Sequence, residues 1–466
     1  MSPANSKSIA VLGGGIAGLT AAHRLTRLGH RVRLFEQSGR VGGALRSERT
    51  PDGWLIEAGP NSLQETPAVS ALIAELDLAP ELVAAAPAAK NRYLVRSGQL
   101  VPLPLSPPAF LKSPLFSFGA KARVVTEFFR RRPRARSRSS DVAHTDISFA
   151  TFIRDHFGSE LLTTAAQPFV SGIYAGDPEK LSARHAFPTL WQLAQTHGSV
   201  LRGQIATAKA RRARGEPATP RLVSFRGGLQ TLTDTLAARL PRDTVTLHAR
   251  AESLHSGPGA WQLTWRDLAT AAPHTETFDA IVSALPAAGL EPLAIDGALP
   301  FASLSAIEHP PVSALFLGYR REQITHALDG FGLLVPATEQ RSILGVIFNS
   351  TLFPGRAPEG HVAINVMVGG ALQPDLARLT TFELTTAIAP DLRQLLGVTG
   401  EPVFHRHTFW PRAIPQYNLG HGQHLATLAD CERLHPGLFL GGQVRDGISL
   451  PASLAAGENL ATRATS

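Results

Sequence analysis

The sequence predicts an α/β fold with a parallel sheet, on three observations. Apolar residues 9–12 form a strand pattern that runs directly into a glycine-rich turn at 13–18 and then into a helical pattern. A second strand pattern at 32–35 ends in an acid, Glu36. Buried-strand patterns recur much later in the chain. Strand, glycine turn, helix and second strand in this order are typical of a Rossmann-type dinucleotide-binding domain.

At three positions of the turn there is a physical reason for glycine. A side chain at Gly13 would block the tight turn, one at Gly15 would keep a pyrophosphate off the backbone, and one at Gly18 would push the helix off the sheet. The helix that follows directs its N-terminal N–H groups at the phosphates. The turn is therefore expected to bind a dinucleotide.

The residues after the second strand indicate FAD rather than NAD. The Glu36 carboxylate is placed to accept hydrogen bonds from both ribose hydroxyls and would repel a 2'-phosphate. The segment Arg40-Val41-Gly42-Gly43 resembles an element that many FAD enzymes of the glutathione-reductase superfamily carry after the ribose acid. NAD dehydrogenases generally lack it. We therefore expect FAD as the cofactor.

Length and composition describe a large globular protein. With 466 residues the chain exceeds one ordinary core, so two or three lobes are expected. The net charge of +8 comes from 45 basic and 37 acidic side chains, and only six of the basic ones are lysines. Codon usage in a GC-rich genome is sufficient to produce such an arginine bias across the whole chain, but it does not explain local clusters.

Cysteine usage and the N-terminus predict the compartment. The single Cys431 cannot form an intramolecular disulfide, which fits a reducing environment. The first eight residues carry no secretory signal, and no run of about eighteen apolar residues could span a bilayer. We expect a cytoplasmic protein, with any contact to the inner face of the cytoplasmic membrane being peripheral.

The FAD-binding domain is expected to be discontinuous. It is predicted to comprise residues 1–85, 205–289 and 415–466. Strand patterns at 244–248, 278–286 and 438–440 place the two later pieces in it. Three distant segments would then converge on one cofactor.

Two further parts lie between these pieces. Residues 86–98 and 290–414 alternate strand-like runs and are expected to form a mixed-sheet substrate-binding domain. Residues 99–204 are rich in Pro, Phe and Arg and contain helical patterns such as 149–157. They are expected to form a helical lobe at which substrate enters and which associates with a membrane.

One charge cluster stands out in the helical lobe. Residues 130–138 hold six arginines and no acid, with Pro and Ser among them. Two interpretations stay open, a solvated loop and a contact with an anionic membrane surface. In the second, Phe128 and Phe129 would enter the interface together with other nearby phenylalanines, namely Phe110, Phe116 and Phe118. No nucleic-acid partner is expected, because no recognisable nucleic-acid-binding fold surrounds the cluster.

Four later segments are specific enough to indicate a family. They are residues 169–178 (FVSGIYAGDP), 352–358 (LFPGRAP), 410–417 (WPRAIPQY) and 447–451 (GISLP). With these segments in order, the chain resembles the protoporphyrinogen oxidase family over nearly its full length. These flavoenzymes of the penultimate step of haem synthesis are close relatives of the coproporphyrinogen oxidases.

The resemblance implies a set of FAD contacts. The pyrophosphate would lie against Gly13, Gly14, Gly15, Ile16, Ala17 and Gly18. The adenosine ribose would lie at Glu36 and Gln37, followed by Arg40, Gly42 and Gly43. The flavin end would lie near Ala44 and the turn of Gly59, Pro60, Asn61 and Ser62. Ala251 would lie on the adenine side. The isoalloxazine ring would be covered by Ile448, Ser449 and Leu450. Gly422 departs from the family, since some members have a tryptophan there.

The resemblance also implies how the substrate is bound. A porphyrinogen is a large apolar macrocycle with anionic propionates, so its site needs apolar walls and a cation at the rim. Arg92 matches the family's propionate-binding arginine, and its forked donors suit a carboxylate. Leu334, Ile347 and Met367 match residues that sandwich the macrocycle, and Gly172 matches a backbone position that faces the pyrroles. No catalytic acid or base and no metal ligand is assigned.

The activity implied is the six-electron oxidation of protoporphyrinogen IX by FAD, with O₂ as acceptor and hydrogen peroxide as product. Alternatives are coproporphyrinogen III oxidation, a flavin amine oxidase or desaturase, and a non-catalytic flavin or porphyrin carrier. Amine oxidases of this fold generally hold a lysine beside the flavin, whereas this chain has none after Lys209. Expected partners are the porphyrinogen and O₂. Membrane contact, hand-over to a ferrochelatase and a homodimer are kept as options.

Overall fold

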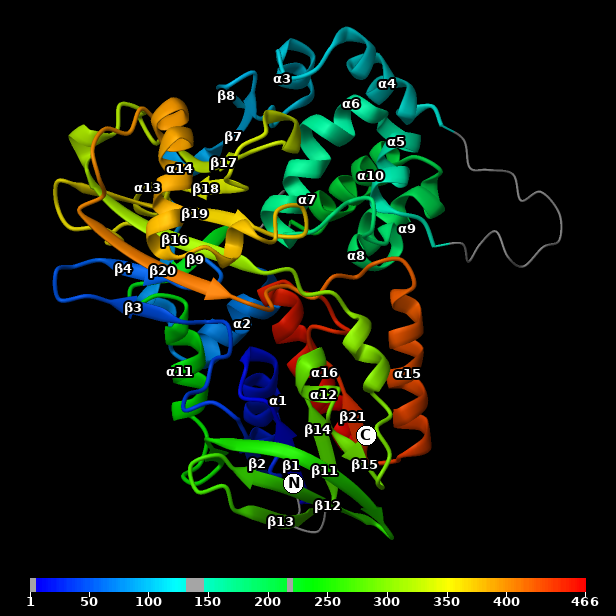
Figure 1. Cartoon of the computed structure of the whole chain (residues 1–466). Coiled ribbons are helices and arrows are strands. Elements are labelled where there is room, and N and C mark those ends of the chain that lie inside the picture. The colour runs from blue at the N-terminus through cyan, green and yellow to red at the C-terminus, as the bar shows by residue number, and fades with distance from the viewer. Residues whose placement is uncertain (1–5, 131–145, 216–220) are drawn as a thin grey trace.

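The computed structural model describes residues 6–130, 146–215 and 221–466, and Figure 1 shows three parts. A parallel sheet with its helices forms one end of the molecule and holds both chain ends. A large mixed sheet and a helical lobe lie beside each other at the opposite end. The protein is therefore an α/β structure with mixed sheets and a largely helical part. All but one of the arginines of the 130–138 cluster fall outside the described residues.

The parallel sheet has the strand order β10-β2-β1-β14-β21. Its strands are β1 (Ser8–Leu12), β2 (Arg31–Phe35), β10 (Val245–Thr246), β14 (Ala280–Ser283) and β21 (Leu438–Leu440). All pairs are parallel, with Val11 opposite Leu34 on one side and Val282 on the other. Strands from three distant parts of the chain thus meet in one sheet, as the sequence patterns predict.

Helices cover one face of this sheet, and a second sheet together with two further helices, the fourth and fifth of those named next, covers the other. The helices of this part are α1 (Ile16–Arg27), α2 (Pro67–Glu75), α11 (Gln230–Ala238), α12 (Ala287–Leu290), α15 (His421–Leu434) and α16 (Leu450–Thr465). Ile9 and Val11 share one core with α1, α2, α11 and α16, whereas Ala10 and Leu12 share another with the second sheet. That sheet, of order β13-β12-β11-β15, comprises β11 (Ala249–Gly257), β12 (Ala260–Asp267), β13 (Pro273–Phe278) and β15 (Ala294–Ile295).

Two strand patterns are shorter than expected. The pattern at 244–248 yields only β10, because His248 adopts a left-handed backbone with φ of 55° and the chain then turns into β11. The pattern at 278–286 is divided at Asp279 between β13 and β14, which belong to different sheets. The apolar run hides this break, because Phe278 at the end of β13 is buried like the four residues of β14.

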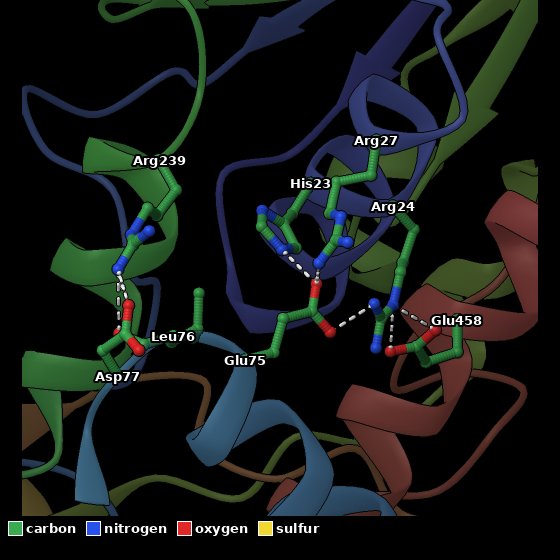
Figure 2. A network of polar contacts seen from close by, with 8 residues as sticks. All are labelled: His23, Arg24, Arg27, Glu75, Leu76, Asp77, Arg239 and Glu458. Carbon is green, nitrogen blue, oxygen red and sulfur yellow. Dashed lines mark hydrogen bonds and ion pairs between the residues drawn. The ribbon is translucent and has the colours of Figure 1, made fainter.

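A polar network near the C-terminal end of α1 ties this helix to its neighbours. Glu75 of α2 accepts hydrogen bonds from Arg24 and Arg27 of α1 at 2.5 Å each and contacts His23 at 2.9 Å. Arg24 also bonds both oxygens of Glu458 on α16, at 2.7 Å. Figure 2 shows these side chains converging from the three helices. The network holds α1 between α2 and α16.

The seven-stranded mixed sheet has the order β20-β16-β19-β18-β17-β7-β8. It comprises β7 (Asn91–Arg96), β8 (Gln99–Pro102), β16 (Val312–Arg320), β17 (Gly330–Leu334), β18 (Gly345–Ile347), β19 (His361–Gly369) and β20 (Phe404–Trp410). The 16-residue helix α14 (Thr381–Leu396) covers one face, where Leu384, Ile388 and Leu392 share a core with the sheet. The residues expected to begin the helical lobe, 99–102, instead form the edge strand β8.

The helical lobe is held together by a buried acid. Its helices are α3 (Pro107–Lys112), α4 (Phe118–Phe128), α5 (Phe149–Phe157), α6 (Ser159–Leu161), α7 (Gln167–Tyr174), α8 (Ala183–Ala186), α9 (Pro188–His197) and α10 (Val200–Ala213), with a π-helical turn at Leu162–Ala166. Glu127 of α4, only 2% exposed, accepts from Ser199 and the Val200 N–H at the start of α10 and contacts His156 of α5. Burial raises the pKa of Glu127, but these hydrogen bonds outweigh burial and lower it overall.

Smaller elements connect the three parts. They are β3 (Ser47–Arg49), β4 (Leu55–Glu57), β5 (Leu63–Gln64), β6 (Leu82–Ala84), β9 (Leu222–Phe225) and α13 (Asn349–Leu352). Short 3₁₀ helices span Ala79–Glu81, Pro87–Lys90, Ala302–Ala306, Arg321–Gln323, Ala337–Glu339 and Leu376–Arg378. Across the described ranges, the structure contains no helix with the length and apolar character needed to cross a membrane.

Candidate active site

The glycine turn leaves open space at the start of α1. Gly13 has a φ of 98°, which side-chain-bearing residues rarely adopt, and a β-carbon on Gly18 would lie 1.9 Å from the Gly13 carbonyl oxygen. By contrast, a β-carbon on Gly15 would meet no atom within 4 Å. Gly15 is the N-cap of α1, and no side chain caps this helix. The free N–H groups of α1 therefore face a space that a phosphate can fill.

Glu36 lies beside this turn at the end of β2. Its carboxylate accepts hydrogen bonds from the N–H groups of Gly14, at 2.7 Å, and Ser38, at 2.8 Å. Each oxygen keeps a second lone pair for a ribose hydroxyl. The Glu36 carbonyl accepts from Ala249 N–H, which brings β11 and its Ala251 next to the ribose position. Ala251 itself lies two residues further along β11.

The Arg40 side chain braces the loop that follows. Its guanidinium donates to the backbone carbonyls of Val41, Gly43 and Leu45 at 2.6 to 3.1 Å. Burial, with Arg46 nearby, lowers the pKa of Arg40. The Gly42 N–H donates to the Gly14 carbonyl, so this loop is fixed against the glycine turn. The arginine of the Arg-x-Gly-Gly element thereby shapes the loop through backbone contacts.

The loop continues into the turn assigned to the flavin end. A β-carbon on Gly43 would lie 3.3 Å from the Gly15 α-carbon, and one on Gly59 would lie 2.1 Å from the Ala44 carbonyl oxygen. The turn 59–62, which contains Pro60, Asn61 and Ser62, is therefore in contact with the loop that touches the glycine turn. Gly15, Gly43, Ala44 and Gly59 form a continuous line of close backbone approaches. A dinucleotide extended along this line fits the residues present.

The C-terminal segment completes the cradle. A β-carbon added to Gly13 or to Gly442 would approach the Ala284 carbonyl oxygen in either case. The ends of β1, β14 and β21 therefore lie close together. The hydroxyl of Ser449 accepts from Ala452 N–H and caps α16, the helix packed on α1. Ile448 packs against the helical lobe, and Leu450 against the core of α1. The segment 448–450 therefore lies where the dinucleotide-binding part meets the helical lobe.

Four predicted substrate residues share one face of the seven-stranded sheet. Arg92, Gly332 and Ile347 are in register across β7, β17 and β18. Two residues along, Leu334 and Met367 both pair with Gly345 of β18. A spacing of two residues keeps side chains on one face. This is the face opposite α14.

Exposure distinguishes these residues from the core. Leu334, Ile347 and Met367 are each partly exposed, whereas their neighbours on the other face, such as Leu333 and Val346, are buried. Gly172 of α7 approaches the same face, since a β-carbon there would lie 2.3 Å from Leu334 Cδ2. The structure therefore brings together all five residues that the sequence assigned to substrate.

Arg92 lies at the margin of this face. Its guanidinium stands over the Phe331 ring, 5.4 Å from the centroid, and the side chain is exposed. Among the described residues no carboxylate forms an ion pair with it, so its charge is available to an anion. Gly332 and Gly345 add no side chains to the face, so Leu334, Ile347 and Met367 are its apolar groups near the Arg92 cation.

Three contacts that tie this sheet to the cradle were not found from sequence. Asn349 of α13 donates from Nδ2 to Asn61 Oδ1 at 2.6 Å, and Trp410 of β20 donates to the Ala58 carbonyl at 2.9 Å. Arg356 forms a buried ion pair with Glu57, with 3.6 Å between Nη1 and Oε1. No local pattern could reveal partners so far apart in the chain. Only the occurrence of Arg356 and Trp410 in family-specific segments gave a signal.

The Glu57 carboxylate lies where three segments of chain meet. It is 2% exposed and accepts hydrogen bonds from the Ser47 hydroxyl and the Leu229 N–H. Burial raises the pKa of Glu57 to about 7, although Arg356, Ser47 and the Leu229 N–H act in the opposite direction. This group is two residues from Gly59, so the pair fixes the base of the flavin-end turn.

The site offers binding groups rather than an acid or base. The two rows of the sheet that carry Arg92 and Leu334 contain no Asp, Glu or His in the strands β7 and β16 to β20. Over the described part of the chain, no group of three or more His, Cys, Asp or Glu side chains could hold a metal ion. The arrangement is suited to a redox cofactor that carries the chemistry itself.

Comparison with known proteins agrees with this geometry. The family model of flavin containing amine oxidoreductase matches residues 16–464. The chain is 34% identical to protoporphyrinogen oxidase 2, chloroplastic/mitochondrial, of Arabidopsis thaliana, over 97% of this chain and 92% of that one. It is 33% identical to the protoporphyrinogen oxidase of Bos taurus, over 98% of each.

Solved structures show the same fold. A crystal structure of a protein from Exiguobacterium sp. 255-15 superposes with a TM-score of 0.78 at 22% identity, covering 100% of this chain and 99% of that one. Cyclohexylamine oxidase from Brevibacterium oxydans superposes with a TM-score of 0.69 at 16% identity, covering 99% of each chain. The fold is thus that of amine-oxidase-like flavoproteins. By its sequence relatives and its family match, the chain belongs to the protoporphyrinogen oxidase family of flavin containing amine oxidoreductases.

Proposed function

We propose that the chain oxidises protoporphyrinogen IX to protoporphyrin IX in haem biosynthesis, with FAD as cofactor and O₂ as acceptor. The observation that carries this proposal is the shared sheet face of Arg92, Leu334, Ile347 and Met367. That face is connected to the dinucleotide cradle through Asn349 and Trp410. Similarity to named protoporphyrinogen oxidases over nearly the whole chain supports the same activity.

FAD is held by the residues of the cradle. The N-terminus of α1 and Gly15 would accept the pyrophosphate, Glu36 the ribose, and the turn at Asn61 the flavin end. When bound, FAD supplies two-electron oxidation, so three rounds remove six electrons and six hydrogens, and three O₂ become three H₂O₂. We also propose that this part belongs to the glutathione-reductase superfamily and comprises residues 1–85, 205–289 and 415–466.

The chain's own residues bind and orient the substrate. Arg92 would hold a propionate at the rim, where its two-donor fork matches a carboxylate. Leu334, Ile347 and Met367 would pack against the macrocycle and exclude water, with Gly172 closing the opposite side. The propionate contact sets which edge of the macrocycle enters, and the apolar face sets its depth. No side-chain acid or base is required in this account.

The alternative functions predict features that differ from those of this chain. Coproporphyrinogen III carries two more propionates in place of two vinyl groups, and the sheet face with Arg92 at one margin favours the less charged substrate. An amine oxidase of this fold would need a lysine beside the flavin, and none occurs after Lys209. A carrier would bind the same molecules without turnover.

We further propose that the helical lobe, residues 99–204, contacts an anionic membrane surface. Supporting this, Phe118 is 88% exposed and Phe129 is 68% exposed, and both lie on or next to α4. Lys112, Lys121 and Arg130 lie in the same region of the chain. We also propose a cytoplasmic location, on the ground of the single Cys431, together with product hand-over to a ferrochelatase and a homodimer.

Anaerobic mixing tests the function directly. The purified protein carrying FAD is mixed with protoporphyrinogen IX without O₂, and the flavin absorbance near 450 nm is followed. The proposal predicts bleaching, recovery in air and formation of protoporphyrin. A carrier would bind porphyrinogen and keep its flavin absorbance. Parallel turnover on coproporphyrinogen III would assign the substrate.

A further inference from the structure

Two buried asparagine side chains meet between the sheet and the cradle. Asn349 is 3% exposed and Asn61 is 7% exposed, and they come from α13 and from the flavin-end turn. Asn349 Nδ2 donates to Asn61 Oδ1 at 2.6 Å. Asn349 follows β18 by two residues, so it is placed by the same strand that carries Ile347. The contact therefore links the substrate face with the flavin-end turn.

The orientation of the Asn61 amide is determined by its two neighbours. Its Nδ2 donates to the Gly59 carbonyl at 3.2 Å, so a flipped amide would set two acceptor oxygens against each other. Its Oδ1 is already occupied by Asn349. An amide nitrogen carries two hydrogens, and Gly59 uses one. Asn61 is thereby fixed as a donor with one N–H left over.

The pair is a poor arrangement for stability alone. Asn349 Oδ1 is buried and has no hydrogen-bond partner among the described residues. A buried acceptor without a partner is costly, and such exceptions in native structures call for another explanation. An apolar side chain of similar size at 349 would remove this unpartnered oxygen but would leave Asn61 Oδ1 without its donor. A role in orienting Asn61 explains why an amide stands there.

We propose that Asn349 is a positioning residue that fixes the Asn61 amide so that its free N–H is directed at bound FAD. This inference rests on the proposed function, which places the turn 59–62 at the flavin end. Asn349 acts only through Asn61. Trp410 serves as a contrast, because its bond to the Ala58 carbonyl holds the backbone of the same turn without touching the Asn61 side chain.

Two substitutions separate orientation from structure. Asn349→Leu removes the donor. Asn349→Asp keeps the shape but can only accept, so Asn61 must turn its N–H groups toward position 349. Both variants are expected to keep stoichiometric FAD, to lower the reduction potential of bound FAD, and to slow anaerobic flavin reduction by porphyrinogen roughly tenfold, the effect of one lost hydrogen bond. The potential is measured with a redox dye and needs no porphyrinogen.

A double-mutant comparison provides the test. In an Asn61→Ala background, Asn349→Leu and Asn349→Asp should change neither potential nor rate further, because their target is gone. The control Trp410→Phe should add its own effect in the same background. Additive effects of the Asn349 variants, or an unchanged potential in both single variants, would overturn the proposal. If the wild-type protein binds FAD but oxidises no porphyrinogen, the proposed function fails, while the potentials still decide the role of Asn349.

Discussion

A β-carbon on Gly18 would lie 1.9 Å from the carbonyl oxygen of Gly13. Only glycine permits α1 to begin this close to the end of β1. Gly15 lies between them, and a β-carbon on Gly15 would have no atom within 4 Å. The turn therefore separates a glycine required by the fold from a glycine required by a ligand.

This difference predicts opposite effects of two substitutions. Gly15→Val should leave the melting temperature of the apoprotein nearly unchanged and abolish FAD binding, because the side chain occupies the pyrophosphate position. Gly18→Ala should lower the melting temperature of the apoprotein itself, since α1 must move. Thermal unfolding of both apoproteins and their FAD content give the comparison. Stoichiometric FAD in Gly15→Val would remove the phosphate assignment.

The position of Arg92 predicts a binding effect. Arg92→Ala should keep FAD and raise KM for porphyrinogen about tenfold to a hundredfold, because a hydrogen bond to a charged partner contributes roughly 1.5 to 3 kcal/mol. The effect on kcat should be small, as the propionate is held alike in ground and transition states. Arg92→Lys should restore affinity only in part, since lysine lacks the planar fork.

Arg406 offers a matched control for that measurement. It occupies the same row of the sheet at the opposite margin, where its guanidinium is paired with Glu48. Arg406→Ala should leave KM unchanged. Equal KM values for Arg92→Ala and the wild-type protein would mean that the propionate is held elsewhere.

The Glu75 network predicts how stability depends on pH. Burial raises the pKa of Glu75, but hydrogen bonds from His23, Arg24 and Arg27 outweigh it and lower the pKa to about 2. A carboxyl with a lowered folded-state pKa contributes stability that is fully present above its ordinary value of 4.5 and is lost as pH falls toward 2. Glu75→Gln should therefore lower the melting temperature at pH 7 and flatten its fall between pH 4.5 and 2.

Asp77 provides the comparison for Glu75. It pairs with Arg239 nearby in Figure 2, but its side chain is 78% exposed. Exposed ion pairs contribute little. Asp77→Asn should leave the melting temperature nearly unchanged at both pH values, and an effect as large as that of Glu75→Gln would contradict the assigned role of burial.

Membrane contact makes two separable predictions. Replacing the six arginines of residues 130–138 by serine should weaken binding to anionic vesicles at low salt, with a smaller effect at high salt because exposed charges are screened beyond about 8 Å in physiological buffer. Replacing Phe118 and Phe129 by serine should weaken binding at both salt concentrations. Turnover in detergent should change little. Vesicle binding that is unaltered in both variants would leave the cluster a solvated loop.

Sequence patterns predicted the local elements around the candidate site better than the contacts between those elements. The glycines of 13–18, Glu36 and the strand at 438–440 are local signals, and the structure places them together because strand ends in a parallel sheet share one edge. The five predicted substrate residues came from family resemblance, since the exposure of these positions cannot be read from the sequence. By pattern alone, Leu334, Ile347 and Met367 look like core positions.

Long-range polar pairs escaped prediction for a physical reason. Asn61 and Asn349 are 288 residues apart, and neither lies in a pattern that demands a partner. The sheet of β11, β12 and β13 was likewise missed. Its strands mix apolar residues with polar and charged ones, and they lack the continuous apolar runs of β1 and β14. Tertiary pairing, rather than local preference, decides both features.

The most direct test of the account is anaerobic titration of the FAD-loaded protein with protoporphyrinogen IX. The account predicts loss of absorbance near 450 nm, recovery in air, and one protoporphyrin formed for every three O₂ consumed. Faster bleaching by protoporphyrinogen than by coproporphyrinogen III is also predicted. A flavin that stays oxidised in the presence of bound porphyrinogen, or that is reduced only by an amine, would contradict it.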